Sequence, residues 1–208
     1  MNPEEALQAV AAEVEACTDC QLHLSRKRAV PGEGPADAEI LFVGEGPGFH
    51  ENEQGRPFVG AAGRFLEELL AGIGLRRDQV FICNVVKCRP PGNRDPEPAE
   101  IEACSKYLER QIAAIRPKVI VTLGRFSLAR YMPGARISAV HGQPQMIGGR
   151  LVVPMYHPAA ALHQPSLRRT VEEDFRQLPA LIARGAALPG APAQAEPPDE
   201  CPQQLNLF

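Results

Sequence analysis

The apolar positions along the chain predict strands that alternate with helices. Four short apolar runs are typical of buried strands: residues 39–44, 80–86, 118–123 and 151–155. Apolar residues spaced along one helical face predict four long helices: residues 3–16, 61–71, 99–115 and 166–183. The last of these contains Pro179, where we expect it to bend or end. This alternation predicts an α/β fold, with a parallel sheet that helices cover on both faces.

Three of the predicted strands end in segments suited to binding a ligand. The first is followed by the glycine-rich turn 44–48, in which backbone N–H groups can approach a ligand closely. The second ends at Asn84, and the fourth runs into His157. Open α/β sheets bind ligands at the carboxyl ends of their strands, so we expect one site there. Taken singly, each feature has a plainer explanation (a glycine loop, a turn asparagine, a structural histidine), and the prediction rests on their convergence.

Charge is unevenly distributed along the chain. The sequence has 22 Lys and Arg against 25 Asp and Glu, but the acids gather near its two ends. Residues 111–171 contain eight Lys or Arg and no Asp or Glu. A basic surface suits a polyanion such as nucleic acid, and a solvated basic face without a ligand is the alternative.

No apolar run approaches the ~20 residues of a membrane span, and the N-terminal residues lack a signal-peptide pattern. We therefore expect a cytoplasmic protein without a membrane partner.

The spacing of the six cysteines indicates a metal or cluster site. Disulfides are uncommon in the cytosol, where close cysteine pairs are typical of metal ligands. Cys17 and Cys20 form such a pair, and further thiols follow at Cys88 and Cys104. Four thiolates can hold Zn²⁺ or a 4Fe–4S cluster; spread-out single cysteines leave room for the larger group, and buried inert thiols are a further alternative. Cys83, within a predicted strand, is expected in the core, and Cys201 is not expected to be a ligand.

Asn84 and His157 have the chemistry to recognise and activate a pyrimidine base. The Asn84 amide presents a carbonyl oxygen and an NH₂ group side by side. Uracil offers N3–H and O4 in the complementary order, whereas cytosine offers the reverse, so one fixed asparagine can discriminate between them. A histidine at a strand end can donate a hydrogen bond to a developing oxyanion.

With these residues in view, the chain resembles a family 4 uracil-DNA glycosylase, the iron–sulfur branch of that superfamily. The stretches that match are CTDC, GEGPGFHENEQGRPFVGAAGRFL, NVVKCRPPGNRDP, the helix with Cys104, PKVIVTLG and YHPAAALHQPSLRRTVEEDF. The resemblance implies a three-layer α/β/α sandwich with a central four-stranded parallel sheet. It also implies a structural rather than redox 4Fe–4S cluster on four ligands: Cys17, Cys20, Cys88 and Cys104.

The activity that the resemblance implies is hydrolysis of the N-glycosidic bond of a flipped deoxyuridine in DNA, as in base excision repair. Such a monofunctional glycosylase releases uracil and leaves an abasic site. The uracil-binding residues would be Glu45, Gly46, Phe58, Asn84 and His157. His157 would stabilise charge on the departing base, and Glu51, with Glu45 as second choice, would order the water. The family usually has alanine at the position of Gly46 and arginine at the position of His163.

DNA contacts are predicted on both sides of this site. Leu162 and His163, in the loop after His157, could enter the gap that the flipped base leaves. Basic side chains near the same loops are candidates for phosphate contacts: Lys87, Arg89, Arg94, Arg168 and Arg169.

The C-terminal residues differ in composition from the rest. Residues 185–203 are rich in Ala and Pro and predict a disordered linker after a glycosylase domain at 1–184. Residues 204–208 resemble the QLxLF peptide by which bacterial repair proteins bind the replication sliding clamp. Its anchoring residues would be Gln204, Leu205, Leu207 and Phe208. We expect a monomer in the bacterial cytoplasm, associated with the nucleoid.

Two other kinds of protein that bind uracil-containing DNA remain open as alternatives to a glycosylase with turnover. One is a non-catalytic iron–sulfur protein that binds uracil-containing DNA, and the other is a protein that captures such DNA covalently. The covalent sister group carries a basic insert with a histidine near the CRP segment, and residues 88–94 contain no such insert. A plain zinc-binding structural protein is a third possibility.

Overall fold

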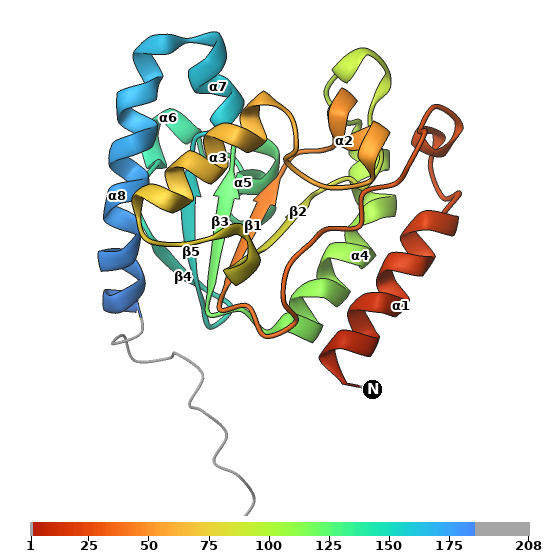
Figure 1. The fold of residues 1–208 in the computed structure, drawn as a ribbon, viewed down its shortest axis with the longest axis horizontal. Coiled ribbons are helices and arrows are strands. Elements are labelled where there is room, and N and C mark those ends of the chain that lie inside the picture. The colour runs from red at the N-terminus through yellow and green to blue at the C-terminus, as the bar shows by residue number, and fades with distance from the viewer. Residues whose placement is uncertain (1, 186–208) are drawn as a thin grey trace, which may run out of the picture.

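Residues 2–185, described by a computed structural model, form an α/β sandwich around one mixed sheet (Figure 1). The strands are β1 (Ile40–Gly44), β2 (Phe81–Asn84), β3 (Val119–Leu123), β4 (Gln145–Ile147) and β5 (Arg150–Met155). Their order in the sheet is β2-β1-β3-β5-β4. The pairs β1–β2, β1–β3 and β3–β5 are parallel, as the four apolar runs predicted, and only β4 runs antiparallel to its neighbour β5 among the described strands.

The expected four-stranded sheet has a fifth strand, β4, at its edge. This strand has three residues, none of them buried, so it lacks the apolar run that marks the other four. It is joined to β5 by Gly148 and Gly149, whose φ angles of 57° and 75° are those of a tight hairpin turn. A Gly-Gly pair between two short apolar segments is a hairpin signal, and it could have identified this strand from the sequence.

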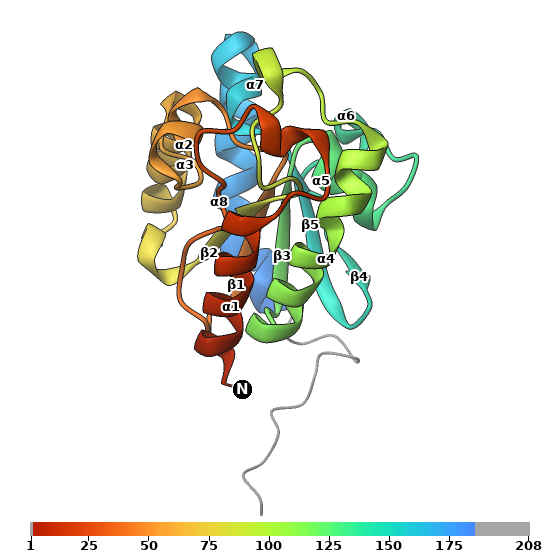
Figure 2. The same cartoon turned by 90° about the vertical axis from the view of Figure 1, so that its right-hand side faces the viewer.

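Helices cover both faces of the sheet, as Figures 1 and 2 show from two directions. The eight α-helices of the described residues are α1 (Pro3–Ala16), α2 (Phe49–Gln54), α3 (Ala61–Gly72), α4 (Pro98–Ile115), α5 (Arg125–Tyr131), α6 (Ile137–Val140), α7 (Pro158–His163) and α8 (Arg168–Gly185). Helix α8 continues through Pro179, so the possibility that it ends there was wrong. Among these helices, none combines the length and apolarity needed to cross a membrane.

Side chains alternate between the two faces along each strand, which gives the sandwich two cores. On one face, Phe42 and Val121 pack with residues of α3, α7 and α8. On the other, Leu41, Val43 and Ile120 pack with α1 and α4. This two-residue period follows from the pleat of a strand. The three-layer architecture predicted for the fold is therefore confirmed, with one more strand than expected.

The strand order places a ligand site where the loops after β1, β2 and β5 meet. The chain passes from β1 to β2 on one side of β1 and then from β2 to β3 on its other side, so the direction of the connections reverses here. In open parallel sheets, such a reversal of strand order opens a crevice at the carboxyl ends of the strands. The glycine turn, Asn84 and His157 all follow strands that share this edge.

Candidate active site

A cleft of about 520 Å³ opens at the carboxyl edge of the sheet. It brings together segments that are far apart in the sequence: the turn after β1, the end of β2, the loop that follows β2, and the start of α7. The residues that line it are Glu45, Gly46, Pro47, Gly48, Glu51, Phe58, Ala62, Asn84, Pro90, Asn93, Arg94, Asp95, His157, Ala159 and His163. Every residue expected from the sequence to bind the base or act on it is among them.

Phe58 is held against the cleft by a strained backbone and by two glycines. Its φ of 51° lies in the left-handed region, which is uncommon for an aromatic residue. A Cβ at Gly44 would fall 2.8 Å from the Phe58 ring, and one at Gly63 would overlap the Phe58 carbonyl. Arg77 donates to that carbonyl oxygen at 2.9 Å. The ring lies 5.4 Å from that of His157, tilted by 26°, so both rings face one narrow space.

Gly46 accommodates a neighbouring side chain. A Cβ at this position would fall 2.7 Å from Cγ2 of Val86, closer than real Cβ contacts come. The alanine that is usual in the family would therefore require Val86 to move. Gly46 also lines the cleft, where the missing Cβ lets a ligand approach the backbone closely.

Asn84 presents an amide oxygen that has no partner. The residue is 1% exposed. Within residues 2–185, three buried side-chain oxygens lack a hydrogen bond, on Asn84, Thr122 and Tyr131, and only Asn84 lines the cleft. A buried acceptor without a partner costs free energy, of order 1–3 kcal/mol. A donor from a ligand in the cleft would remove that penalty, and uracil N3–H is such a donor.

His157 is held as a neutral imidazole in one tautomer. It caps the N-terminus of α7, and its Nδ1 accepts a hydrogen bond from the backbone N–H of Ala159 at 3.1 Å. A ring nitrogen that accepts carries no proton, so the proton lies on Nε2. Removal of the ring from water lowers the pKa of His157 to about 4, an effect that the carboxylate of Glu51 partly opposes. At neutral pH the ring is therefore an uncharged N–H donor.

The two carboxylates of the cleft have different surroundings. Both oxygens of the buried Glu51 accept backbone N–H groups: Oε2 from Gly48 at 3.1 Å, and Oε1 from Val59 and Gly60 at 2.9 Å each. Glu51 thus ties the turn after β1 to the segment that carries Phe58. No such side-chain bond holds Glu45 within residues 2–185. Burial, and then the nearby Asp95, raise the pKa of Glu45 above its usual value.

The four predicted cysteine ligands line a second cavity, between α1, α4 and the loop after β2. Burial raises the pKa of Cys104 to about 11, and it also raises the pKa values of Cys20 and Cys88. Within residues 2–185, no group of three or more His, Cys, Asp or Glu side chains could hold one metal ion. The thiols surround a space instead of converging on a point. Cys83 is buried among the apolar residues of the core, as expected.

The structure overturns one expected DNA contact. The side chain of Lys87 is 1% exposed, and it points into the protein. Its Nζ donates to the backbone oxygen of Asn84 at 3.0 Å and to Oε1 of Gln111 at 2.6 Å. Its backbone N–H donates to Sγ of Cys104 at 3.3 Å. Lys87 therefore cannot reach a phosphate. Instead, it supports the backbone of Asn84.

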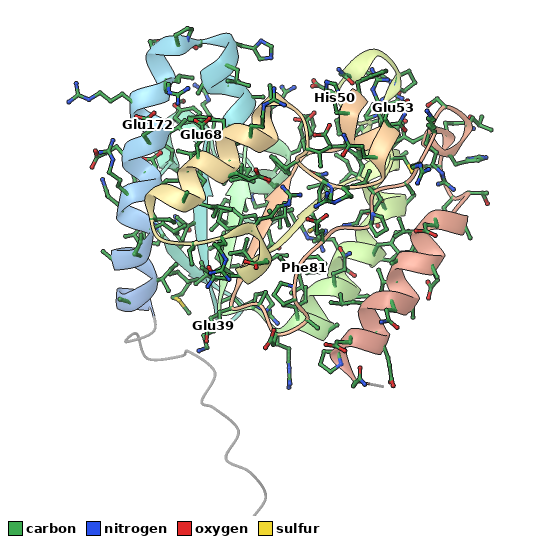
Figure 3. The ribbon with its side chains drawn as sticks, viewed as in Figure 1. Glu39, His50, Glu53, Glu68, Phe81 and Glu172 are labelled. Carbon is green, nitrogen blue, oxygen red and sulfur yellow. The ribbon has the colours of Figure 1, made fainter. Side chains whose placement is uncertain are left out.

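Two of the remaining basic candidates are already paired with acids. Arg94 lines the cleft, but its guanidinium makes a two-fold contact with the buried carboxylate of Glu100, at 2.9 and 2.6 Å. Arg168 bridges Glu172 at 2.9 Å and Glu68 at 3.1 Å. Figure 3 shows these two glutamates close together, on α8 and α3. Both guanidinium groups are thus held by carboxylates, which leaves them less free than expected to bind phosphate.

The other candidates lie at the surface. Leu162 is 43% exposed, and the exposed His163 beside it lines the cleft. Arg169 is exposed, and Arg89 is partly exposed. Arg26 was not predicted from the sequence, yet it reaches the cysteine site, where it donates to Sγ of Cys88 at 3.3 Å. It lies in an irregular segment without a motif. The tail residues 204–208 and Cys201 lie outside the described residues.

The fold and the cleft together define a class of protein. It is an α/β/α sandwich in which an aromatic ring, an amide and a neutral imidazole surround a space suited to a flat heterocyclic base. The chain belongs to the uracil DNA glycosylase superfamily, whose family model matches residues 31–178.

Relatives within this superfamily are named type-4 uracil-DNA glycosylases. The chain is 51% identical over 185 residues to one from Sulfurisphaera tokodaii, with 84% of each chain covered. It is 47% identical over 190 residues to one from Archaeoglobus fulgidus, covering 86% of this chain and 95% of that one. For one from Thermotoga maritima the identity is 48% over 186 residues, covering 87% and 97%. The resemblance to family 4 is thereby confirmed.

Proposed function

We propose that the protein is a monofunctional uracil-DNA glycosylase that flips deoxyuridine out of DNA and hydrolyses its N-glycosidic bond. The observation that carries the proposal is the unpaired amide oxygen of Asn84 in a cleft shared with Phe58 and His157. The printed names of the relatives point to the same substrate. The products are free uracil and an abasic site, as in base excision repair.

Recognition begins with removal of the base from the stack, which costs a few kcal/mol. The Phe58 ring then offers its face to the base. Oδ1 of Asn84 accepts N3–H, and its NH₂ group donates to O4. Cytosine has an acceptor at N3 and a donor at the 4-position, so it would meet two like groups. Lys87 supports this reading because it fixes the backbone of Asn84.

Bond cleavage leaves negative charge on the base and positive charge on the sugar. His157 donates its Nε2–H to O2 of the departing uracil, and the fixed tautomer means that no proton has to move before the reaction. Glu45 and Gly46 line the same cleft, and their backbone N–H groups would add to this stabilisation. The carboxylate of Glu51, close enough to affect the His157 ring, stabilises the cationic sugar.

The attacking water requires an acceptor with a free lone pair. Glu51 was the first choice from the sequence, but its carboxylate already accepts three backbone N–H groups. Glu45 lines the cleft, and no bond within the described residues holds its side chain. We therefore assign the orientation of the water to Glu45, and the stabilisation of charge and of the loop to Glu51.

This division of roles predicts different results for two matched substitutions. Glu45→Gln should lower the single-turnover rate about 100-fold with little change in melting temperature, because an amide is a poor base. Glu51→Gln should lower the melting temperature by about 3–8 °C, because its NH₂ group would face backbone N–H donors. Single-turnover kinetics and thermal melts of both variants measure this. A full rate in Glu45→Gln, with a 100-fold loss in a stable Glu51→Gln, would reverse the assignment.

We further propose that Cys17, Cys20, Cys88 and Cys104 hold a 4Fe–4S cluster. The donor set fits: four thiols from the end of α1, the loop after β2, and α4 surround one cavity, with Arg26 donating to Cys88. Thiolates are the ligands of such clusters. When bound, the cluster would cross-link these three segments. The loop after β2 also contains Lys87, which bonds Cys104 and the backbone oxygen of Asn84, so the cluster would also stabilise the support of Asn84.

The cluster proposal predicts a contrast between two buried cysteines. Cys104→Ser should lose the bound iron and the visible absorbance of the cluster, and the melting temperature should fall. The matched control is Cys83→Ala, which removes another buried thiol that lies outside the cavity and should keep the iron. Iron assays and absorption spectra of the purified variants measure this. Stoichiometric zinc in the wild type, or full iron in Cys104→Ser, would refute the cluster.

The tail residues 204–208 are proposed to bind the replication sliding clamp. Two leucines and a terminal phenylalanine can fill a hydrophobic groove, and residues 185–203 supply reach. A chain ending at residue 203 should lose binding to the purified clamp and keep full activity on short oligonucleotides. Retention of clamp binding by this shortened chain would rule the motif out.

The activity itself is tested with single-stranded and double-stranded oligonucleotides that contain one uracil. The wild type should release free uracil with multiple turnovers. Parallel substrates with hypoxanthine, xanthine or thymine define its range. A bound oligonucleotide without base release would favour the non-catalytic alternative, and a covalent adduct would favour the trapping one.

A further inference from the structure

One large aromatic side chain is exposed at the rim of the cleft. Within residues 2–185, the exposed large apolar side chains are Leu24, Phe49 and Leu162. Phe49 is 53% exposed and begins α2, directly after Gly48, which lines the cleft. The proposed mechanism gives this ring no role. An exposed aromatic ring beside a binding cleft is suited to contact with the ligand.

The neighbours of Phe49 form a surface with it. The guanidinium of Arg89 lies 5.4 Å from the centre of the Phe49 ring. Asn93 fixes this arginine by accepting its Nε–H at 2.7 Å. His50 packs edge-on against Phe49, with ring centres 5.4 Å apart and an angle of 82°. Figure 3 shows His50 on α2, near the loop that follows β2. Phe49 is therefore ordered by its neighbours while half of it stays open.

Arg89 differs from Arg94 and Arg168 in its partners. Arg94 and Arg168 are both paired with carboxylates. None of the ion pairs within the described residues includes Arg89, whose partners are a neutral amide and an aromatic face. Its positive charge is thus available to an anion. Since Pro90 and Asn93 line the cleft, this charge lies at the cleft's edge.

A half-exposed aromatic ring beside an available guanidinium is a combination that binds single-stranded nucleic acid. Bases stack on the ring, and the cation attracts the phosphate next to them. When one nucleotide leaves the strand, each of its two neighbours loses a stacking partner. Leu162, on α7, is the candidate for the gap, and Figure 1 shows α7 to the left and α2 to the right in the upper part of the molecule. A second surface is therefore available near α2 for a neighbouring base.

We propose that Phe49 and Arg89 form a stacking shelf for the base adjacent to the flipped nucleotide. The shelf rests on the proposed uracil excision, and it adds a contact to the substrate strand outside the uracil pocket. It tolerates any base, because every base has a flat face. It lowers the KM for the DNA strand and leaves the bond-breaking step unchanged, because it lies outside the group of residues that face uracil.

The test combines protein variants with altered substrates. Three single-stranded oligonucleotides carry one uracil: an unmodified strand, one that lacks the base on the 5′ side of the uracil, and one that lacks it on the 3′ side. On the unmodified strand, Phe49→Ala should raise KM about 5- to 100-fold with kcat unchanged. The wild type should show the same loss on one of the two modified strands, and on that strand Phe49→Ala should cause no further loss.

Matched variants separate stacking from general packing. Phe49→Tyr keeps the ring and should retain the wild-type KM. Leu24→Ala removes another exposed apolar side chain, 70% exposed, and should change neither constant. The shelf is refuted if Phe49→Ala behaves as the wild type on the unmodified strand, lowers kcat alone, or raises KM equally on all three strands.

A binding measurement distinguishes failure of the shelf from failure of the proposed activity. Fluorescence anisotropy with the same three strands reports affinity without base release. If the wild type releases no uracil from any strand, the proposed activity fails, and the anisotropy alone decides the shelf. The shelf then predicts that Phe49→Ala weakens binding of the unmodified strand and leaves one of the two modified strands unaffected. Equal effects on all strands would refute it.

Discussion

An Asn84→Asp variant is expected to lose about 10²- to 10⁴-fold in the single-turnover rate of uracil release. The carboxylate can still accept uracil N3–H, but it has no donor for O4, and its charge would repel that oxygen. Asn84 itself is buried, so water cannot replace the missing donor once uracil fills the cleft. The native preference for uracil over cytosine depends on the order of donor and acceptor on the amide. The ratio of the uracil rate to the cytosine rate should therefore fall sharply in the variant.

The control for this substitution is Asn84→Gln, which keeps both amide groups but displaces them by one methylene. It should be impaired through geometry alone and keep its preference for uracil over cytosine. Single-turnover assays on matched strands with uracil or cytosine measure both variants. If Asn84→Asp keeps the wild-type ratio of uracil to cytosine release, this amide does not read the base.

A His157→Leu variant should lose about 10²- to 10³-fold in the single-turnover rate, the usual effect of removing one oxyanion donor. Leucine fills a similar space but cannot donate to O2. His157→Gln, which restores an N–H donor, should recover part of the loss. A rate in His157→Leu within a few-fold of the wild type would show that stabilisation of the departing base comes from elsewhere in the cleft.

The lowered pKa of His157 adds a pH dependence that the leucine variant should lack. The ordinary value of 6.5 applies to the unfolded chain, and about 4 applies to the folded protein. Between these values the unfolded chain binds the proton first, so stability falls as the pH decreases from about 6.5 to about 4. The wild-type rate should not fall through protonation of His157 until the pH approaches that lower value. Thermal melts across this range should show a smaller decline for His157→Leu.

The sequence was sufficient to predict the parts of the fold that have strong local patterns. The runs around Phe42, Ile82, Val121 and Val153 are apolar because those strands are buried on both faces. Strand β4 was not predicted, because it is held by the hydrogen bonds of a hairpin at the sheet edge, where no apolar run is required. The last helix does not end at Pro179, although a proline disfavours a helix interior. The apolar face of α8 packs on the sheet, and this packing keeps the helix intact.

The site was predictable where several polar or glycine-rich segments occur at the carboxyl ends of predicted parallel strands, because such ends meet at one edge of the sheet. The glycine turn, Asn84 and His157 were found in this way, and they line one cleft. The role of Lys87 was not predictable, because a lysine in a proline-rich loop resembles a surface residue. Its burial depends on Gln111, which lies on a helix far along the chain. The different environments of Glu45 and Glu51 likewise depend on backbone N–H groups whose positions only the folded loop defines.

The most direct test of the account is a crystal structure of the protein bound to a strand with one uncleavable 2′-fluorodeoxyuridine. The account predicts a uracil ring outside the base stack and in the cleft, against Phe58. Its N3 and O4 should lie within hydrogen-bond distance of the Asn84 amide, and its O2 within that distance of Nε2 of His157. A flipped uracil that contacts neither side chain, or one bound outside this cleft, would contradict the account.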